Sequence, residues 1–376
     1  MALACGIVGL PNVGKSTIFN ALTSAKAAAA NFPFCTIEPN TGVVKVPDSR
    51  LQDIAALIPP EKITPASVTF VDIAGLVKGA SKGEGLGNQF LAHIREVNAV
   101  AHVVRCFADP QVVHVAAAPA PGRDPLPTVD PARDVGIIET ELMLADLQTV
   151  EKGYPTLEKS ARAGVKEAVL KFAVLAKVRT ALEAGKPVRS LKLDENDSLE
   201  IRDYHLITEK PVLYLANVDD GDSANPDANV HVAKLKQIAA AEGAGVVAIC
   251  GKLESELAEM SAEDRATFLK ELGMAEPGLN RVVRATYVLL GLETYFTAGP
   301  KEVRAWTVRK GAKAPQAAGV IHSDFERGFI KAEVYHYDDL MRLKTELAIK
   351  DAGLLRQEGK EYVVRDGDLM LFKFNV

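Results

Sequence analysis

A glycine-rich segment near the N-terminus constrains the fold more than any other feature of the sequence. Residues 9–16 read GLPNVGKS and fit the pattern G-x-x-x-x-G-K-[ST]. An apolar run at residues 3–8 predicts a buried strand before this segment, and residues 16–24 predict a helix after it. Successive backbone N–H groups in a loop between a strand and a helix form a cradle for phosphate oxygens, backed by the positive end of the helix. The sequence therefore begins with a predicted strand–loop–helix unit for the phosphates of a nucleoside triphosphate.

Two side chains of this loop have chemistry that suits a triphosphate. Lys15 is expected to bridge the β- and γ-phosphates, which makes it a candidate catalytic residue. The hydroxyl of Ser16 is expected to be a ligand of Mg²⁺, the metal cofactor that we predict. The glycines let the backbone approach the phosphates without a clash from a Cβ atom.

Further apolar runs predict that this unit belongs to an α/β fold with a doubly wound parallel sheet. The runs are separated by segments of helical length, an arrangement typical of such sheets. They lie at residues 68–71, 99–104, 211–216 and 245–249.

The C-terminal part of the chain has short apolar runs of a different pattern, which predict a separate, small α+β domain. Its short apolar runs lie at residues 303–308, 329–335, 362–364 and 369–374.

A long stretch between the third and fourth predicted strands does not fit the spacing of a strand–helix–strand unit. Residues 111–133 are rich in Ala and Pro and predict a surface loop. Apolar residues then recur at helical spacing in the runs 138–145 and 165–176, which predict two antiparallel helices similar to a coiled coil. Gly153-Tyr154-Pro155 is expected to interrupt this pattern near its middle. Ordinary core helices of the sheet domain are the alternative.

Composition and charge limit the partners of the chain. It has 44 basic and 49 acidic residues and a net charge of −5, so nucleic-acid binding would need a local basic patch. The four cysteines form no CxxC pair, and no run of about eighteen apolar residues occurs, so we expect no disulfide framework, zinc site or membrane partner. A multi-domain cytoplasmic protein is predicted. A candidate patch for RNA phosphates comprises Arg304, Arg309, Lys310 and Lys313, close to Trp306, with scattered surface charge as the alternative.

Two loop segments predict a nucleotide-dependent switch of the GTPase type. Asp72 ends the second predicted strand and begins a D-x-x-G pattern whose last residue is Gly75. Asp72 can hold Mg²⁺ through water, and the Gly75 amide can sense a γ-phosphate whose loss releases the loop. Thr36, in the loop upstream, offers a hydroxyl that completes the Mg²⁺ shell. Leu76 stands where small GTPases place a glutamine that orients the attacking water, so slow intrinsic hydrolysis is expected.

The residues after the fourth predicted strand are candidates for reading the base. Guanine-binding proteins carry N-K-x-D there, and this chain reads NVDD at residues 217–220. Asp220 occupies the position whose carboxylate accepts hydrogen bonds from guanine N1 and N2, while Val218 replaces the stacking lysine. Cys250-Gly251 stands where a Ser-Ala loop closes over the base. A simple Asx turn after the strand is the alternative interpretation.

Taken together, these motifs resemble those of the Obg-like ATPases of the YchF type, which are TRAFAC-class P-loop NTPases. The most specific matches are NFPFCTIEPN at residues 31–40, DIAGLVKGA at 72–80 and TYFTAGPKE at 294–302. The resemblance covers essentially the whole chain and implies a molecule of three parts. These are a Ras-like, OBG-type G domain at 1–280, a helical coiled coil inserted at about 131–205, and a C-terminal α+β ubiquitin-like TGS domain at 291–374.

The resemblance also implies roles for individual residues. Asn217 would hydrogen-bond the adenine edge, with Val218 beside the ring. His114 falls on the position of the family's proposed replacement for the missing glutamine, as a catalytic residue that orients water or accepts its proton. Mg²⁺ contacts are implied for Ser16 and Thr36. Phosphate contacts are implied for Asn12, Val13, Gly14, Lys15, Ser16 and Thr17.

The implied function is that of a ribosome-associated nucleoside triphosphatase, which slowly hydrolyses ATP with Mg²⁺ and acts as a switch in translation or stress regulation. Its implied partners are ATP, the ribosome, chiefly the large subunit, and RNA, and we expect a monomer. Asp220 replaces a family glutamate and has the length that suits guanine, so use of GTP as well stays open. The alternatives are an Obg-like GTPase that prefers GTP, and a nucleotide-gated ribosome- or RNA-binding module whose hydrolysis is incidental.

Overall fold

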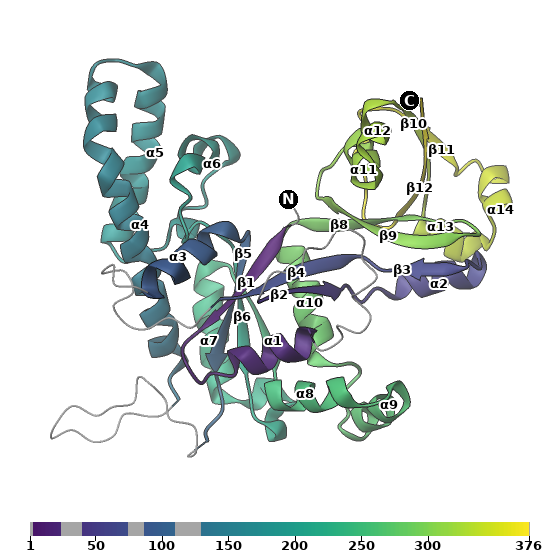
Figure 1. Ribbon diagram of the computed structural model, residues 1–376, viewed down its shortest axis with the longest axis horizontal. Coiled ribbons are helices and arrows are strands. Elements are labelled where there is room, and N and C mark those ends of the chain that lie inside the picture. Colours follow the sequence, from purple (N-terminus) through teal and green to yellow (C-terminus); the bar gives the residue numbers. More distant parts are fainter. Residues whose placement is uncertain (1–2, 24–39, 74–85, 110–128, 376) are drawn as a thin grey trace. The chain divides into compact units, whose positions relative to one another are not determined.

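The computed structural model describes residues 3–23, 40–73, 86–109 and 129–375 (Figure 1). The chain divides into two compact units, which we call the first and the second unit. The first unit comprises Met1–Gly42 and Thr69–Thr286, and the second comprises Val43–Val68 and Tyr287–Val376. The described strands form two six-stranded sheets, one centred in each unit. Among the described helices, none is long and apolar enough to cross a membrane.

The sheet of the first unit has the strand order β2-β4-β1-β5-β6-β7. β1 pairs in parallel with β4 and β5, and β6 pairs in parallel with β5 and β7, which confirms the expected α/β sheet. The carboxyl ends of these parallel strands therefore meet at one edge of the sheet, where ligands bind in such folds. The bounds are β1 Ala4–Gly9, β2 Thr41–Lys45, β4 Ser67–Asp72, β5 Ala99–Arg105, β6 Val212–Asn217 and β7 Gly245–Ile249.

The helices of the first unit explain why its strands read as continuous apolar runs. Every residue of β5 and of β6 is buried, as expected when helices cover both faces of a parallel sheet. α1 begins soon after β1, and α8 follows β7 directly, so both helices start at the carboxyl edge of the sheet. The helices outside the insert are α1 (Lys15–Thr23), α3 (Leu86–Glu96), α7 (Val230–Glu242), α8 (Gly251–Glu259), α9 (Ala262–Glu271) and α10 (Gly278–Leu289).

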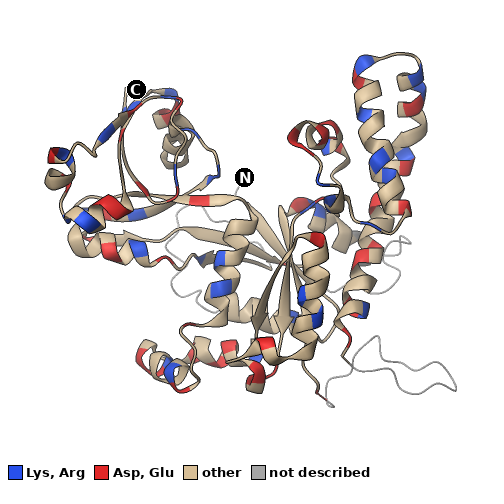
Figure 2. Ribbon diagram, turned by 180° about the vertical axis from the view of Figure 1, so that it is seen from behind, with Lys and Arg blue, Asp and Glu red and all other residues tan. Residues whose placement is uncertain are grey.

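The insert contains two long helices, α4 (Pro131–Arg162) and α5 (Lys166–Glu183), which pack side by side (Figure 1). The expected interruption at residues 153–155 is wrong, because α4 continues through Pro155. A proline inside a helix removes one hydrogen bond but does not always end the helix. The chain turns at Gly164 instead, whose φ of +81° accompanies a hydrogen bond from Val165 N–H to the Ser160 carbonyl. Figure 2 shows basic and acidic residues interspersed along both helices.

The sheet of the second unit has the strand order β11-β10-β12-β8-β9-β3. The predicted strand at residues 362–364 is wrong, because Val363 makes an isolated bridge with Lys313 and β11 is the edge strand. The strands are β3 Lys62–Thr64, β8 Leu292–Thr297, β9 Glu302–Arg309, β10 Phe329–His336, β11 Arg356–Glu358 and β12 Asp368–Phe374. The helices are α2 (Ser49–Leu57), α11 (Ala314–Ile321), α12 (Ser323–Arg327), α13 (Tyr337–Leu343) and α14 (Glu346–Asp351).

The second unit is not a single continuous stretch of chain, which differs from the division expected from the sequence. Residues 43–68, which run from within β2 to within β4, belong to it together with the C-terminal residues. β3 pairs in parallel with β9, and the Thr64 hydroxyl donates a hydrogen bond to Glu302. This pairing joins segments far apart in the sequence, and no local pattern could have indicated it.

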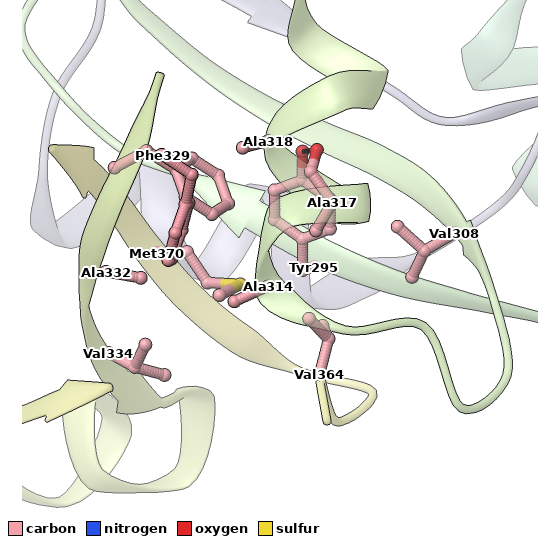
Figure 3. Packing of buried hydrophobic residues seen from close by; sticks show 11 residues of the cluster. Tyr295, Val308, Ala314, Ala317, Ala318, Phe329, Ala332, Val334, Val364 and Met370 are labelled. Atoms are coloured by element: carbon pink, nitrogen blue, oxygen red, sulfur yellow. Dashed lines mark hydrogen bonds between the residues drawn. The ribbon is translucent and has the colours of Figure 1, made fainter. Parts of the chain in front are cut away.

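Small residues on one helix let the core of the second unit close tightly (Figure 3). Ala314, Ala317 and Ala318 of α11 are fully buried in this core. Tyr295 of β8 packs against them, and its hydroxyl donates to the Ala317 carbonyl at 2.9 Å. Trp306 packs against the same cluster. The tryptophan of the candidate RNA patch therefore contributes to the core of the unit.

A buried ion cluster attaches the insert to the sheet of the first unit. Arg189, in the 3₁₀ helix η4 (Val188–Leu191), lies 2.7 Å from carboxylate oxygens of Glu139 on α4 and Glu242 on α7. The hydroxyl of Tyr214 on β6 also donates to Glu242, at 3.2 Å. Burial raises the pKa of Glu139, and the guanidinium of Arg189 opposes this shift. The cluster thus joins elements of the insert to α7 and β6.

Replacing Arg189 by alanine is expected to lower the free energy of unfolding by about 3–5 kcal/mol, because two carboxylates would lose their buried counter-charge. Arg162→Ala is the matched control, since it breaks an exposed pair with Glu158 near the end of α4 and should cost less than about 1 kcal/mol. Urea unfolding followed by far-ultraviolet circular dichroism measures both. Equal effects of the two substitutions would contradict a structural role for the cluster.

Candidate functional site

The predicted phosphate loop joins β1 to α1 as expected. Gly14 has a φ of +92°, a left-handed conformation that favours glycine, and a Cβ atom there would collide with the Asn217 amide. The first N–H groups of a helix have no partner within the helix, so the start of α1 suits a phosphate. The side chain of Val13 is buried, whereas those of Asn12, Ser16 and Thr17 are exposed.

The structure brings together two predicted site residues from different loops. Lys15, at the start of α1, makes an ion pair with Asp72, at the end of β4, and their side chains are 11% and 19% exposed. The sheet order explains this pairing, because β4 lies next to β1 with Asp72 opposite Ile7. The Asp72 carboxylate and the Ser16 hydroxyl are oxygen donors of the kind that Mg²⁺ prefers, so these residues fit the expected metal.

The Asn217 side chain fastens the phosphate loop to the segment that follows β7. Its Nδ2 donates to the Val13 carbonyl at 2.8 Å, and its Oδ1 accepts from the Gly251 N–H at 2.9 Å. The side chain is buried. The sequence did not indicate this bridging role, because both partners are backbone groups of other loops. An amide keeps one further donor hydrogen and one further lone pair, so its contact with an adenine edge stays a prediction.

The Asp220 carboxylate is held by two residues of the segment after β7. Its Oδ1 accepts from Cys250 Sγ at 3.0 Å, and its Oδ2 accepts from Lys252 Nζ at 2.7 Å. The hydrogen bond from Lys252, and then that from Cys250, lowers the pKa of Asp220. Asp219 accepts a hydrogen bond from the Asp220 N–H and caps the 3₁₀ turn η6 (Asp220–Asp222). An Asx turn has the N–H two residues on as its donor, so this contact does not confirm the alternative interpretation. Lys252 was missed because a single lysine after a strand carries no sequence signal.

Val218, directly after β6, and Cys250, directly after β7, are both buried. The N–H of Val218 donates to the Ile249 carbonyl at 2.9 Å, so its backbone is tied to the end of β7. Cys250 caps α8 by accepting from the Leu253 N–H at 3.5 Å. Burial raises the pKa of Cys250 to about 11, so the group is a protonated thiol near neutral pH and can donate to Asp220.

Several predicted residues lie outside the part of the chain that the structure describes. They are Thr36, Gly75, Leu76 and His114. Their assigned roles as metal ligand, γ-phosphate sensor, replaced glutamine and catalytic histidine stay predictions.

Arg105 is a residue of the carboxyl edge that the sequence analysis missed. It ends β5, its side chain is fully buried, and it donates to the carbonyls of Phe107 at 3.0 Å and Asp109 at 3.1 Å. The guanidinium carbon also lies 4.6 Å from the centroid of the Phe107 ring. Arg105 therefore shapes the backbone directly after β5. A basic residue at the end of an otherwise apolar run was the available signal.

Comparison with known families agrees with the fold and with the phosphate loop. Residues 4–125 match a family model described as a 50S ribosome-binding GTPase. Residues 292–375 match the YchF-GTPase_C model, which is described as a protein of unknown function. Together with the parallel sheet and the loop at residues 9–16, these matches define a P-loop nucleoside triphosphatase of the GTPase type.

Full-length relatives narrow this class to one family. The ribosome-binding ATPase YchF of Bacillus subtilis (strain 168) is 53% identical over 376 residues, and that of Escherichia coli O157:H7 is 52% identical over 377 residues. Both alignments cover 100% of this chain and 100% of the relative. A solved structure of the Schizosaccharomyces pombe YchF GTPase is 39% identical, with a TM-score of 0.86, and the match covers 99% of this chain and 97% of that one. The chain belongs to the YchF family.

Gly14→Ala is expected to destabilise the first unit by about 1–3 kcal/mol, since alanine disfavours the left-handed backbone and its Cβ would displace Asn217. The same displacement should weaken ATP binding. Gly136→Ala on α4 is the matched control: no atom lies within 4 Å of the added Cβ, and the change should stabilise the helix by up to about 1 kcal/mol. Urea unfolding and titration with a fluorescent ATP analogue test both variants. Wild-type behaviour of Gly14→Ala would refute the proposed packing.

Proposed function

We propose that this chain is a ribosome-binding ATPase that hydrolyses ATP slowly to ADP and phosphate with Mg²⁺ and acts as a nucleotide-dependent switch. The ion pair of Lys15 with Asp72 at the phosphate loop is the observation that carries this proposal. The names of the full-length relatives, ribosome-binding ATPases, support it. The proposal includes a monomeric, cytoplasmic protein that serves translation or stress regulation.

In the proposed site the phosphates lie against the start of α1. Lys15 leaves Asp72 for the β- and γ-phosphate oxygens and neutralises charge that develops during transfer. Ser16, Thr36 and Asp72 would hold Mg²⁺, whose charge, when bound, offsets that of the phosphates. The backbone amide of Gly75 would contact the γ-phosphate and release its loop after hydrolysis.

The proposed hydrolysis is slow because Leu76 stands where small GTPases place the glutamine that orients the attacking water. The Leu76 side chain has no polar atom that could orient water. We assign this role to His114, whose imidazole can orient the water or accept its proton. A low intrinsic rate suits a switch whose turnover depends on a partner.

The preference for ATP over GTP follows from the residues after β6. Val218 is apolar where a lysine would stack on guanine, and Asn217 keeps one donor and one lone pair for the adenine edge. Asp220, the residue that would read guanine, already has two partners. GTP hydrolysis is the second candidate function, because the Schizosaccharomyces pombe relative is described as a GTPase and an aspartate has the length that suits guanine.

The ribosome, chiefly its large subunit, and RNA are the proposed partners. The match of residues 4–125 to a model described as a 50S ribosome-binding GTPase supports the large subunit. We assign residues 1–280 to an OBG-type G domain with α4 and α5 as its coiled coil, and residues 291–374 to a TGS domain. Residues 43–68 of the first range belong to the second unit, together with the C-terminal residues. In the candidate RNA patch, Arg309 and Lys310 are exposed, whereas Lys313 pairs with Glu361 at 2.6 Å.

Single-turnover hydrolysis of radiolabelled ATP, with and without ribosomes, tests the proposed function. Lys15→Met is expected to lower the rate by about 10²-fold or more, because the charge that meets the phosphates is lost. Removal of Mg²⁺ with EDTA should also abolish hydrolysis. Lys236→Met breaks an exposed pair with Asp227 and should leave the rate unchanged.

Two outcomes would point elsewhere. ATP-dependent co-sedimentation with ribosomes, without any stimulation of hydrolysis, would favour the binding module with incidental turnover. Failure of the wild-type chain to bind ATP or GTP at saturating Mg²⁺ would refute the proposed function.

A further inference from the structure

The carboxylate that would read guanine lies in a polar cluster formed by two adjacent strand ends. β6 and β7 pair in parallel with Asn217 opposite Ile249, so the segments that follow them run side by side. Asp220 belongs to the first segment, and Cys250 and Lys252 belong to the second. Each carboxylate oxygen has its own donor, the Cys250 thiol for Oδ1 and the Lys252 ammonium for Oδ2.

We propose that Lys252 determines base specificity: by pairing with Asp220 it disfavours guanine nucleotides and thereby favours ATP. This inference rests on the proposed nucleotide-binding function, and it adds the residue that biases the choice of base. Nothing in the N-K-x-D comparison at residues 217–220 points to Lys252, which lies after the neighbouring strand.

The chemistry of the two bases explains the direction of the effect. Guanine presents two donors, N1–H and the N2 amino group, to a carboxylate at the reader position. Cys250 and Lys252 each occupy one lone pair of the Asp220 carboxylate, and the ammonium of Lys252 also offsets its charge, so the donors of guanine meet a weaker acceptor. Adenine presents no donor at N1 or C2, so it makes no demand on Asp220. A free carboxylate would face the lone pair of adenine N1, and the pairing with Lys252 lowers this repulsion.

The exposure of the pair sets the size of the effect. The side chain of Lys252 is 70% exposed and that of Asp220 is 48% exposed, so water and salt screen their attraction. Exposed pairs of this kind correspond to a factor of about 1.5 to 5 in an equilibrium constant. Cys250 is buried and fixed by the Leu253 N–H, so it anchors one oxygen of Asp220 while Lys252 supplies the charge.

Titration of ATP and GTP, each with Mg²⁺, against the wild type and Lys252→Met tests the proposal. The ratio of the two dissociation constants is the readout, because both nucleotides carry the same phosphates and general effects of salt cancel. Lys252→Met should tighten GTP binding relative to ATP by about 2- to 5-fold at an ionic strength of about 0.05 M. Raising the ionic strength to about 0.5 M should move the wild type toward GTP and leave the variant unchanged.

Two further variants isolate the pair. Lys236→Met, which breaks an exposed Lys–Asp pair on α7, should keep the wild-type ratio. In an Asp220→Asn background, Lys252→Met should no longer improve GTP binding, because the carboxylate that it frees is absent. Loss of the gain in that background would support the pairing as the cause.

The outcomes separate this inference from the proposed function. If the wild type binds neither nucleotide, the proposed function fails. If it binds nucleotide but Lys252→Met leaves the ratio unchanged, Lys252 has no part in base choice and the inference is overturned. Weaker GTP binding by Lys252→Met would also overturn it, since the lysine would then assist guanine.

Discussion

The two hydrogen bonds of the Asn217 side chain hold the candidate site together. The Val13 carbonyl, in the phosphate loop, and the Gly251 N–H, at the start of α8, lie far apart in the sequence, and one buried amide joins them. Gly14 supplies the space that this amide needs, since a Cβ atom there would collide with it. A buried backbone group left without its partner costs about 1–3 kcal/mol. The phosphate loop and the base-reading region are therefore not independent, because each fixes the position of the other.

The charged pairs of the first unit differ in how far their side chains are buried, and this affects how easily each pair can separate. Arg189 and its carboxylate partners are nearly excluded from water, where a pair adds little net stability but is costly to break. The pair of Lys252 with Asp220 is exposed and can exchange partners at small cost. Lys15 and Asp72 are about as buried as Arg189 and Glu242, at 11% and 19% exposure against 9% and 19%. Such a pair is placed firmly, yet both charges stay within reach of a ligand.

Local sequence patterns were enough to predict much of the fold. The apolar runs located the parallel strands, and the glycine pattern at residues 9–16 located the turn into α1. Contacts between distant segments were not predictable, such as the pairing of β3 with β9 or of Asp220 with Lys252. The predicted interruption at Pro155 was wrong because neighbouring turns can keep a helix intact despite one lost hydrogen bond. The chain turns at Gly164 instead, where the backbone has a positive φ. The sequence thus predicted which residues belong to the candidate site, but not the hydrogen bonds and ion pairs that connect them.

Phosphate recognition and base recognition use different parts of this architecture. The phosphate loop offers backbone N–H groups and a helix end, which contact a tail common to all nucleoside triphosphates. In the proposed site, base recognition falls to side chains after β6 and β7, where Val218 is buried but Asp220 and Lys252 are exposed. Exchanges at exposed loop positions cost the fold little. The choice of base can therefore change without a change in the sheet. In the proposed site, the pairing of Asp220 after β6 with Lys252 in the first turn of α8 biases the choice of nucleotide, and the parallel pairing of β6 with β7 brings these two segments together.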